Sequence, residues 1–166
     1  MSDYWPRFRK FVPKIDANIA SEGHEIIQTQ NPKHFVLQKV VESDYYGFYE
    51  NELKLRKSGR YPPFARTALI EVKDENESDA MGAINDFYKY LSAYRKQIDI
   101  SVPTPALIPK IMKQYRFHIL IKSDRETDPG GKILRTAIEK ALANYNQKSR
   151  YRNIKIFVDI DVNSIM

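Results

Sequence analysis

The pattern of apolar and polar residues is most regular after residue 64. Runs of extended, β-branched-rich sequence there alternate with stretches in which apolar residues recur every three or four positions. Ser78 or Asp79 is the expected N-cap of the first such helix, and Asp128-Pro129-Gly130-Gly131 opens the second. In chain order the predicted elements are a strand at 65–73, a helix to about 95, strands at 98–102 and 115–122, a helix to about 146, and a strand at 154–160. The proline-rich residues 103–109 are predicted to form a loop.

This order, β-α-β-β-α-β, predicts an α+β fold, the ferredoxin-like split βαβ sandwich. In that fold two helices cover one face of a four-stranded antiparallel sheet, and short connections leave few other topologies. The predicted core residues are Leu69, Ile84, Phe87, Leu91, Ile119, Ile121, Leu134, Ile138, Ile156 and Val158.

The first 64 residues show a less regular pattern. A short strand is predicted at 25–30, a helix at 33–41, and a second helix from about 45 to 57, capped by Ser43 or Asp44 and ended by Gly59. The two prolines of Tyr61-Pro62-Pro63-Phe64 fix two φ angles, which is typical of a junction between folded units. Three segments are therefore predicted, residues 1–22 of uncertain origin, residues 23–59, and a domain at 60–166.

The net charge of +6, with a sequence pI near 9.4, favours polyanionic partners. Residues 59–166 carry most of it, with 18 Lys/Arg against 13 Asp/Glu, whereas residues 1–58 have 9 against 8. The absence of cysteine excludes disulfides and thiolate zinc sites and favours a cytoplasmic protein. No apolar run approaches the roughly 20 residues of a membrane span, so no membrane association is predicted.

Catalytic motifs are missing from the sequence. There is no G-x-x-x-x-G-K-[ST] phosphate loop and no nucleophile beside a base, and the three histidines lack metal-ligand spacing. We therefore expect no catalytic residues, no bound metal and no cofactor in this chain itself.

Two clusters of basic and aromatic residues are candidates for nucleic-acid binding, since basic groups neutralise phosphates and aromatic rings stack on bases. Lys110, Lys113 and Arg116 recur every three residues around the third strand, and a second cluster precedes the last strand. If these loops converge, one end of the sheet forms a positive platform; the alternative is a solvated basic rim. The predicted binding residues are Arg66, Lys110, Lys113, Tyr115, Arg116, Arg150, Tyr151 and Arg152.

Separated motifs in this chain resemble those of the primosomal protein N′ family, the bacterial replication-restart DNA helicases. Residues 52–64 fit E-x-x-x-R-x-x-x-x-Y-P-P-F. Residues 102–117 fit the family's G-P-x-P-A-x-x-x-K-x-x-x-x-Y-R-[YF] pattern, with Val102 where the family often has glycine. Residues 158–166 are similar to its I-D-V-D-P ending, with Val162 where the family has proline. Residues 23–34 resemble the stretch that closes the second helicase lobe. The resemblance therefore spans about residues 23–166.

The resemblance implies a parent protein that is an ATP-dependent 3′-to-5′ helicase, with ATP, magnesium and zinc bound outside this chain. Residues 60–166 would be its C-terminal domain, and residues 23–59 the end of the second helicase lobe with a connecting helix. Implied partners are forked or single-stranded DNA, the single-strand-binding protein and other primosome proteins. The alternatives are a protein-docking module with little DNA affinity, and a small RNA-binding protein of the same fold.

The predicted strand at 25–30 would have lost its neighbours in the motor lobe. Because an unpaired strand edge tends to pair with another chain, a homodimer through residues 1–45 is also predicted.

Overall fold

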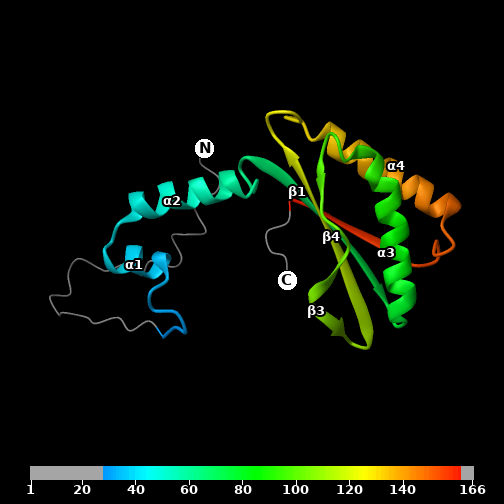
Figure 1. Cartoon of the computed structure of the whole chain (residues 1–166), viewed down its shortest axis with the longest axis horizontal. Helices are drawn as coiled ribbons and strands as arrows, with labels where there is room; N and C mark the ends of the chain where they lie inside the picture. Colours follow the sequence, from blue (N-terminus) through cyan, green and yellow to red (C-terminus); the bar gives the residue numbers. More distant parts are fainter. Residues whose placement is uncertain (1–27, 162–166) are drawn as a thin grey trace, which may run out of the picture. The chain divides into compact units, whose positions relative to one another are not determined.

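The computed structural model describes residues 28–161. The chain divides into two compact units, Met1–Ser43 and Asp44–Met166. In the first, helix α1 spans Phe35–Val41, and His34 caps it by accepting a hydrogen bond from the Val36 amide (Figure 1). Residues 28–30 are not a strand, and residues 25–27 of the predicted strand lie outside the described part of the chain.

The second unit begins with helix α2, Tyr45–Ser58, close to its predicted bounds. Asp44 is the N-cap, and its Oδ1 accepts a hydrogen bond of 2.8 Å from the Gly47 amide. The C-cap is Gly59, as predicted, but it keeps right-handed φ and ψ values. Arg60 instead takes the left-handed conformation, with φ of 53°, so the chain reverses one residue later than glycine would have suggested.

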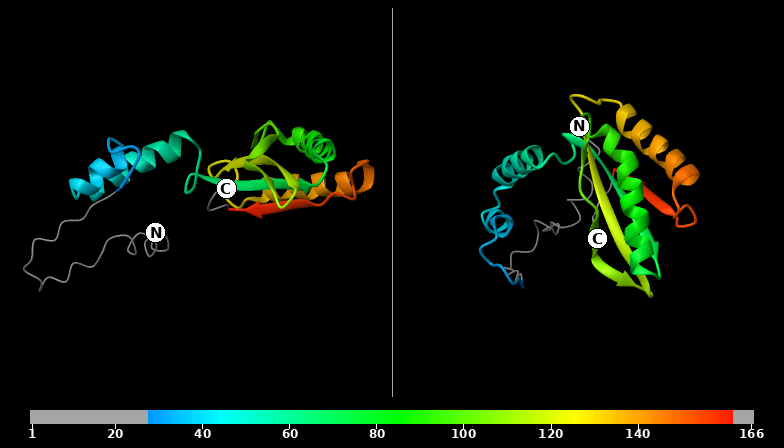
Figure 2. Two further views of the ribbon diagram at one scale, coloured as in Figure 1. Left: turned by 90° about the horizontal axis from the view of Figure 1, so that it is seen from below. Right: turned by 45° about the vertical axis from the view of Figure 1, so that its right-hand side comes forward.

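The rest of the second unit is the predicted split βαβ sandwich. The strand order is β2-β4-β1-β5, every pair is antiparallel, and β3 pairs with β4 on the same edge as β2. Helices α3 and α4 pack on one face of this sheet (Figures 1 and 2). The bounds are β1 Ala65–Asp74, α3 Glu77–Leu91, a 3-10 turn at Ser92–Tyr94, β2 Asp99–Ile100, β3 Thr104–Ile111, β4 Gln114–Asp124, α4 Lys132–Lys148 and β5 Ile156–Ile160.

The core lies between the helices and the sheet. Successive strand residues point to opposite faces, so Ala68, Ile70 and Val72 of β1 face the helices, whereas Leu69 points to the other face. Leu69 is buried there but does not belong to the main cluster. Of the other predicted core residues, Ile156 and Val158 are partly buried, and the rest are buried in the cluster.

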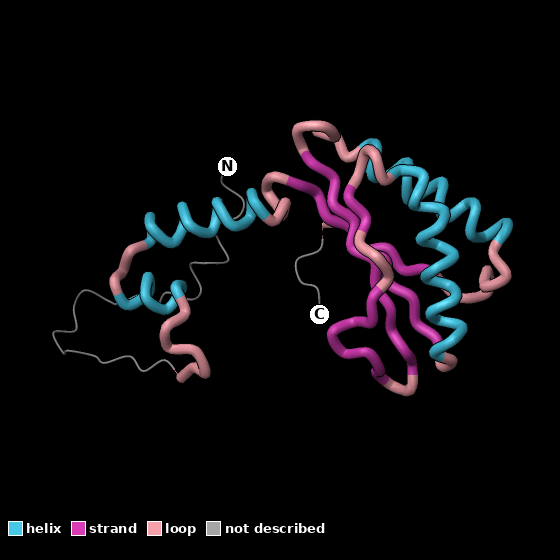
Figure 3. Tube along the Cα trace, in the orientation of Figure 1, coloured by secondary structure: helices cyan, strands magenta, loops and turns pink. Residues whose placement is uncertain are grey.

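The largest error of prediction concerns the loop predicted at residues 103–109, because residues 104–109 form most of strand β3, Thr104–Ile111 (Figure 3). β3 is an edge strand, and an edge strand tolerates proline because half of its amides need no partner in the sheet. The pairing with β4 shifts register between Pro105 and Lys110. The preceding strand is correspondingly shorter than predicted, only Asp99–Ile100.

Helix α3 also differs from its prediction at both ends. The N-cap is Asn76 rather than Ser78 or Asp79. Its side-chain oxygen accepts hydrogen bonds from the backbone amides of Ser78 and Asp79. The helix ends at Leu91 and continues as a 3-10 turn. The predicted segment boundaries at residues 22 and 59 stay predictions. None of the helices within residues 28–161 combines the length with the apolar composition of a membrane-spanning segment.

Candidate nucleic-acid interface

The β3–β4 hairpin brings two predicted residues together. Lys110 and Tyr115 are cross-strand partners, and the Lys110 Nζ lies 4.1 Å from the centre of the Tyr115 ring and donates a 3.0 Å hydrogen bond to its hydroxyl. Met112 and Lys113 form the turn with φ of 49° and 67°. Two positive φ values in a turn match the right-handed twist of paired strands. The Lys113 side chain at this turn is exposed.

Arg116 lies on the other face of the sheet, where a carboxylate neutralises it. Its Nε donates a 2.9 Å hydrogen bond to Glu71, which also contacts Lys73 and the buried His118. Burial opposes ionisation of Glu71, but hydrogen bonds from Lys73, His118 and Arg116 outweigh it and lower the pKa of the carboxyl to about 2. The Arg116 side chain is 13% exposed, so the structure places it in an internal ion cluster.

Acidic residues share the hairpin end of the sheet. Asp74 is the cross-strand partner of Tyr115, which places Asp74, Tyr115 and Lys110 in one row across three strands. Glu75 and Glu77 follow directly and are exposed. The positive charge of Lys110 and Lys113 is therefore offset by carboxylates at the same end.

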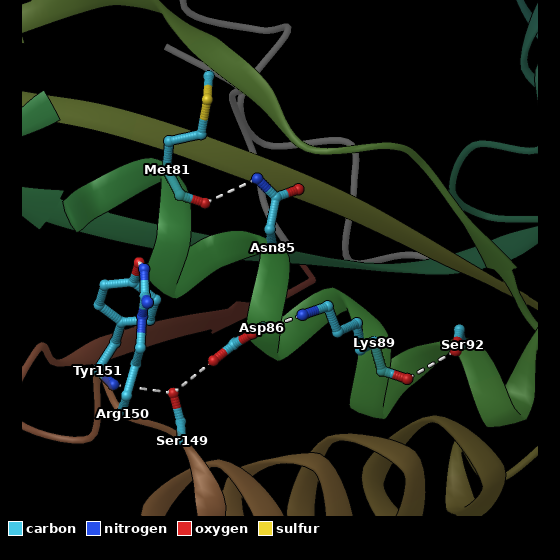
Figure 4. Close-up of polar contacts among 8 residues, drawn as sticks. All are labelled: Met81, Asn85, Asp86, Lys89, Ser92, Ser149, Arg150 and Tyr151. Carbon is cyan, nitrogen blue, oxygen red and sulfur yellow. Dashed lines mark hydrogen bonds and ion pairs between the residues drawn. The ribbon is translucent and has the colours of Figure 1, made fainter. Parts of the chain in front are cut away.

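The second predicted cluster is packed against α3 (Figure 4). The Arg150 guanidinium lies 4.5 Å from the centre of the Tyr151 ring and also donates a hydrogen bond to its hydroxyl. A Cβ added to Gly82 of α3 would come within 2.2 Å of the far end of that ring. Tyr151 therefore packs on α3 beneath Arg150. Arg152 is exposed as well, but its side chain forms no hydrogen bond or ion pair with the described residues.

A short polar chain anchors this loop. The Tyr151 amide donates to the Ser149 hydroxyl, which donates in turn to Asp86 of α3 at 2.9 Å (Figure 4). Burial opposes ionisation of Asp86, but hydrogen bonds from Lys89 and Ser149 lower the pKa of its carboxyl. A hollow of about 390 Å³ beside the loop is lined by Asp79, Arg150, Tyr151, Asn153 and Ile154.

Arg66 does not join either cluster. It lies near the start of β1 opposite Ser123, whereas Lys73 near the end of β1 lies opposite Arg116, so Arg66 is at the other end of the sheet. Its guanidinium contacts Asp161 at 3.4 Å and donates to the Pro129 carbonyl at 3.2 Å. Convergence of all the basic loops, one of the two alternatives that the sequence left open, therefore does not extend to Arg66.

Sequence reasoning missed the cations of α4. Residues 132–155 contain seven Lys/Arg and a single carboxylate, Glu139, and all seven cations are exposed. By contrast, residues 74–91, which include α3, contain five Asp/Glu and one lysine, Lys89. Counting charge element by element would have found this asymmetry. The seven cations are Lys132, Arg135, Lys140, Lys148, Arg150, Arg152 and Lys155.

The amino end of α4 is occupied by the chain's own carboxylate. Buried Asp128 accepts hydrogen bonds from the Ser123 hydroxyl and from the amides of Ile133 and Leu134. Burial opposes its ionisation, but these bonds together lower the pKa of the carboxyl. Those amides are thus unavailable to an external anion. Among residues 28–161, no group of three His, Cys, Asp or Glu is placed to hold a metal ion.

Comparison with known proteins identifies the family. Residues 57–163 match the sequence model of the primosomal protein N C-terminal domain. The chain is 29% identical over 140 residues to the replication restart protein PriA of Bacillus subtilis, covering 84% of this chain and 17% of that protein. It is 30% identical over 126 residues to PriA of Thermotoga maritima, covering 74% of this chain and 17% of that protein.

A third relative is PriA of Borreliella burgdorferi, 33% identical over 99 residues, which cover 59% of this chain and 15% of that protein. The chain spans less than a fifth of the length of these relatives. The matched region holds the whole split βαβ sandwich and the Tyr-Pro-Pro-Phe junction that precedes it. The chain therefore belongs to the primosomal protein N C-terminal domain family.

Proposed function

We propose that this chain is the part of a replication restart protein that binds forked or single-stranded DNA. The observation that carries the proposal is the family match over residues 57–163, in a domain with an excess of exposed cations. The predicted cations with exposed side chains support the proposal as candidates for phosphate contact; these are Lys110 and Lys113 at the hairpin and Arg150 and Arg152 in the α4–β5 loop.

We further propose that the domain docks the single-strand-binding protein and other primosome proteins. In the whole protein, ATP-dependent 3′-to-5′ helicase activity, with its ATP, magnesium and zinc, would belong to residues outside the matched region. The described residues would position DNA and partners rather than perform chemistry. A homodimer through residues 1–45 stays a prediction that falls largely outside the described residues.

The test is fluorescence anisotropy of the 166-residue chain with a fork, a single strand and a duplex across a salt series. Phosphate contacts release counterions, so the logarithm of the binding constant should fall with log salt by about 0.9 for each contact on duplex DNA. Preference for the fork with a steep slope is the expected result. No binding to any DNA at low salt would contradict the proposal.

A protein-docking module is the second candidate, and the edge strand β3 favours it. Leu107, Ile108 and Met112 are 76%, 52% and 92% exposed along β3 and its turn, an apolar stretch that phosphates would not contact. A docking module would bind a partner peptide with weak salt dependence and would not retain DNA. Tighter binding to single-stranded RNA than to a DNA fork would instead support the third candidate, an RNA-binding protein.

A further inference from the structure

Helix α4 has two faces of different character. Leu134, Ala137, Ile138, Ala141 and Tyr145 point into the core. The outer face carries Lys132, Arg135 and Lys140, followed by exposed Asn146, Gln147 and Lys148 at the carboxyl end. The apolar stripe thus fixes the orientation of the helix and turns its cations to solvent.

The α4 cations are not engaged within the described part of the molecule. Within residues 28–161, the charged side chains of four α4 residues form no ion pair and no hydrogen bond; these are Lys132, Arg135, Lys140 and Lys148. This distinguishes them from Arg116, which Glu71 neutralises, and from Arg66, which contacts Asp161. Cations without internal partners keep their full charge for an external anion.

The same surface has no aromatic ring available for stacking. Tyr145 is buried, and its hydroxyl donates to the Tyr151 and Ile154 carbonyls. Tyr151 packs on Gly82 beneath Arg150. Single-strand binders combine cations with exposed stacking rings, whereas a duplex hides its bases and offers phosphates. The chemistry of α4 therefore suits a duplex backbone.

The length of the surface agrees with this ligand. The 17 residues of α4 extend about 25 Å, the length of roughly seven base pairs of duplex. Arg150, Arg152 and Lys155 continue the cations past the end of the helix. The neighbouring α3, with its carboxylates, would repel phosphates and so limit the binding surface to the α4 side.

We propose that the outer face of α4 with residues 150–155 binds the phosphate backbone of duplex DNA, the double-stranded arm of the fork. This inference rests on the proposed function, because it assigns a surface and a DNA class to that activity. It differs from the sequence prediction, which assigned binding to the hairpin at residues 110–116.

The experiment compares three variants of the 166-residue chain with the unchanged chain. The α4 variant is Lys132→Ala, Arg135→Ala and Lys140→Ala; the hairpin variant is Lys110→Ala and Lys113→Ala. The charge-matched control is Lys54→Ala, Lys57→Ala and Lys96→Ala, three exposed lysines on α2 and after α3. Anisotropy with a duplex of about 12 base pairs, longer than α4 spans, gives affinity and salt slope. Circular dichroism melting checks that each variant folds.

The α4 variant should bind duplex at least about tenfold more weakly at low salt, with a salt slope reduced by about 2 to 3. The charge-matched control should keep most of the affinity. Equal losses in the α4 variant and the control would show that only net charge matters and would overturn the inference. Loss confined to the hairpin variant would overturn it too, while leaving the proposed function standing. If the unchanged chain binds no DNA, the proposed function itself fails.

Discussion

Helices α3 and α4 both bury an apolar face in the core, but their solvent-exposed faces carry opposite net charge. They pack on one another and on the sheet, and Phe87 of α3 meets Tyr145 of α4 edge to face with ring centres 6.0 Å apart. Yet α3 carries three carboxylates and one lysine, whereas α4 carries four cations and one carboxylate. The comparison teaches that the inner faces determine the fold, and that the outer faces are where a function would be found.

Equal roles in the core predict equal sensitivity to truncation. Phe87→Ala and Leu134→Ala each remove a fully buried side chain, so both should lower the free energy of unfolding by about 2 to 5 kcal/mol. Urea denaturation of the two variants measures this. A cost below about 1 kcal/mol for either one would mean that its helix contributes little to the core.

Two side chains accept hydrogen bonds from the first amides of a helix, and their contributions should differ because Asp128 before α4 is buried and Asn76, the N-cap of α3, is exposed. Asp128→Ala leaves the Ile133 and Leu134 amides and the buried Ser123 hydroxyl without their acceptor, so it should cost about 2 kcal/mol or more. Asn76→Ala removes the exposed cap of α3 and should cost about 1 kcal/mol. Thermal melts of the two variants rank the two contributions, and a larger loss for Asn76→Ala would contradict the structure.

The Asp128 carboxylate also predicts a pH dependence of stability. Because its pKa is lowered in the folded state, its contribution is present above the unfolded pKa of about 3.9 and is lost as pH falls below that value. The stability difference between the unchanged chain and Asp128→Ala should therefore shrink on acidification from pH 6 to about 3. A difference that is constant over this range would indicate that the carboxylate does not accept the hydrogen bonds at the start of α4.

A smaller effect is expected where α3 meets the loop after α4. Gly82→Ala would place a methyl group 2.2 Å from Tyr151, so the ring must move, at a cost of about 1 to 2 kcal/mol after the gain in helix propensity. Tyrosine fluorescence and urea denaturation report the displacement and the cost. A more stable variant would show that Tyr151 does not pack there.

The smallest effect on stability is expected from the outer cations. Removing the charges of Lys132, Arg135 and Lys140 should change the free energy of unfolding by no more than about 0.5 kcal/mol per site, because these exposed side chains have no partner among the described residues. Denaturation alongside the binding experiment measures it. A large destabilisation would mean that the cations support the fold instead of a ligand.

Sequence predicted the fold because the helices and strands of residues 65–160 have clear apolar periods. The prediction was wrong at β3, where the prolines indicated a loop although an edge strand tolerates proline. The ion pair of Arg116 could not be predicted from the sequence. Its contact with Glu71 depends on the β1–β4 register, which sets Lys73 opposite Arg116 and Glu71 two residues away on the same face. The packing of Tyr151 on Gly82 is likewise a tertiary contact between residues 69 positions apart. The charge of α4, in contrast, was readable from composition alone.

The most direct test of the central claim is a map of the bound surface. Backbone amide chemical shifts of the 166-residue chain would be followed as duplex DNA is added. The account predicts that the shifts move along the outer face of α4 and through residues 150–155, and that those of α3 stay in place. Changes confined to the hairpin at residues 110–116, or spread over α3, would contradict it.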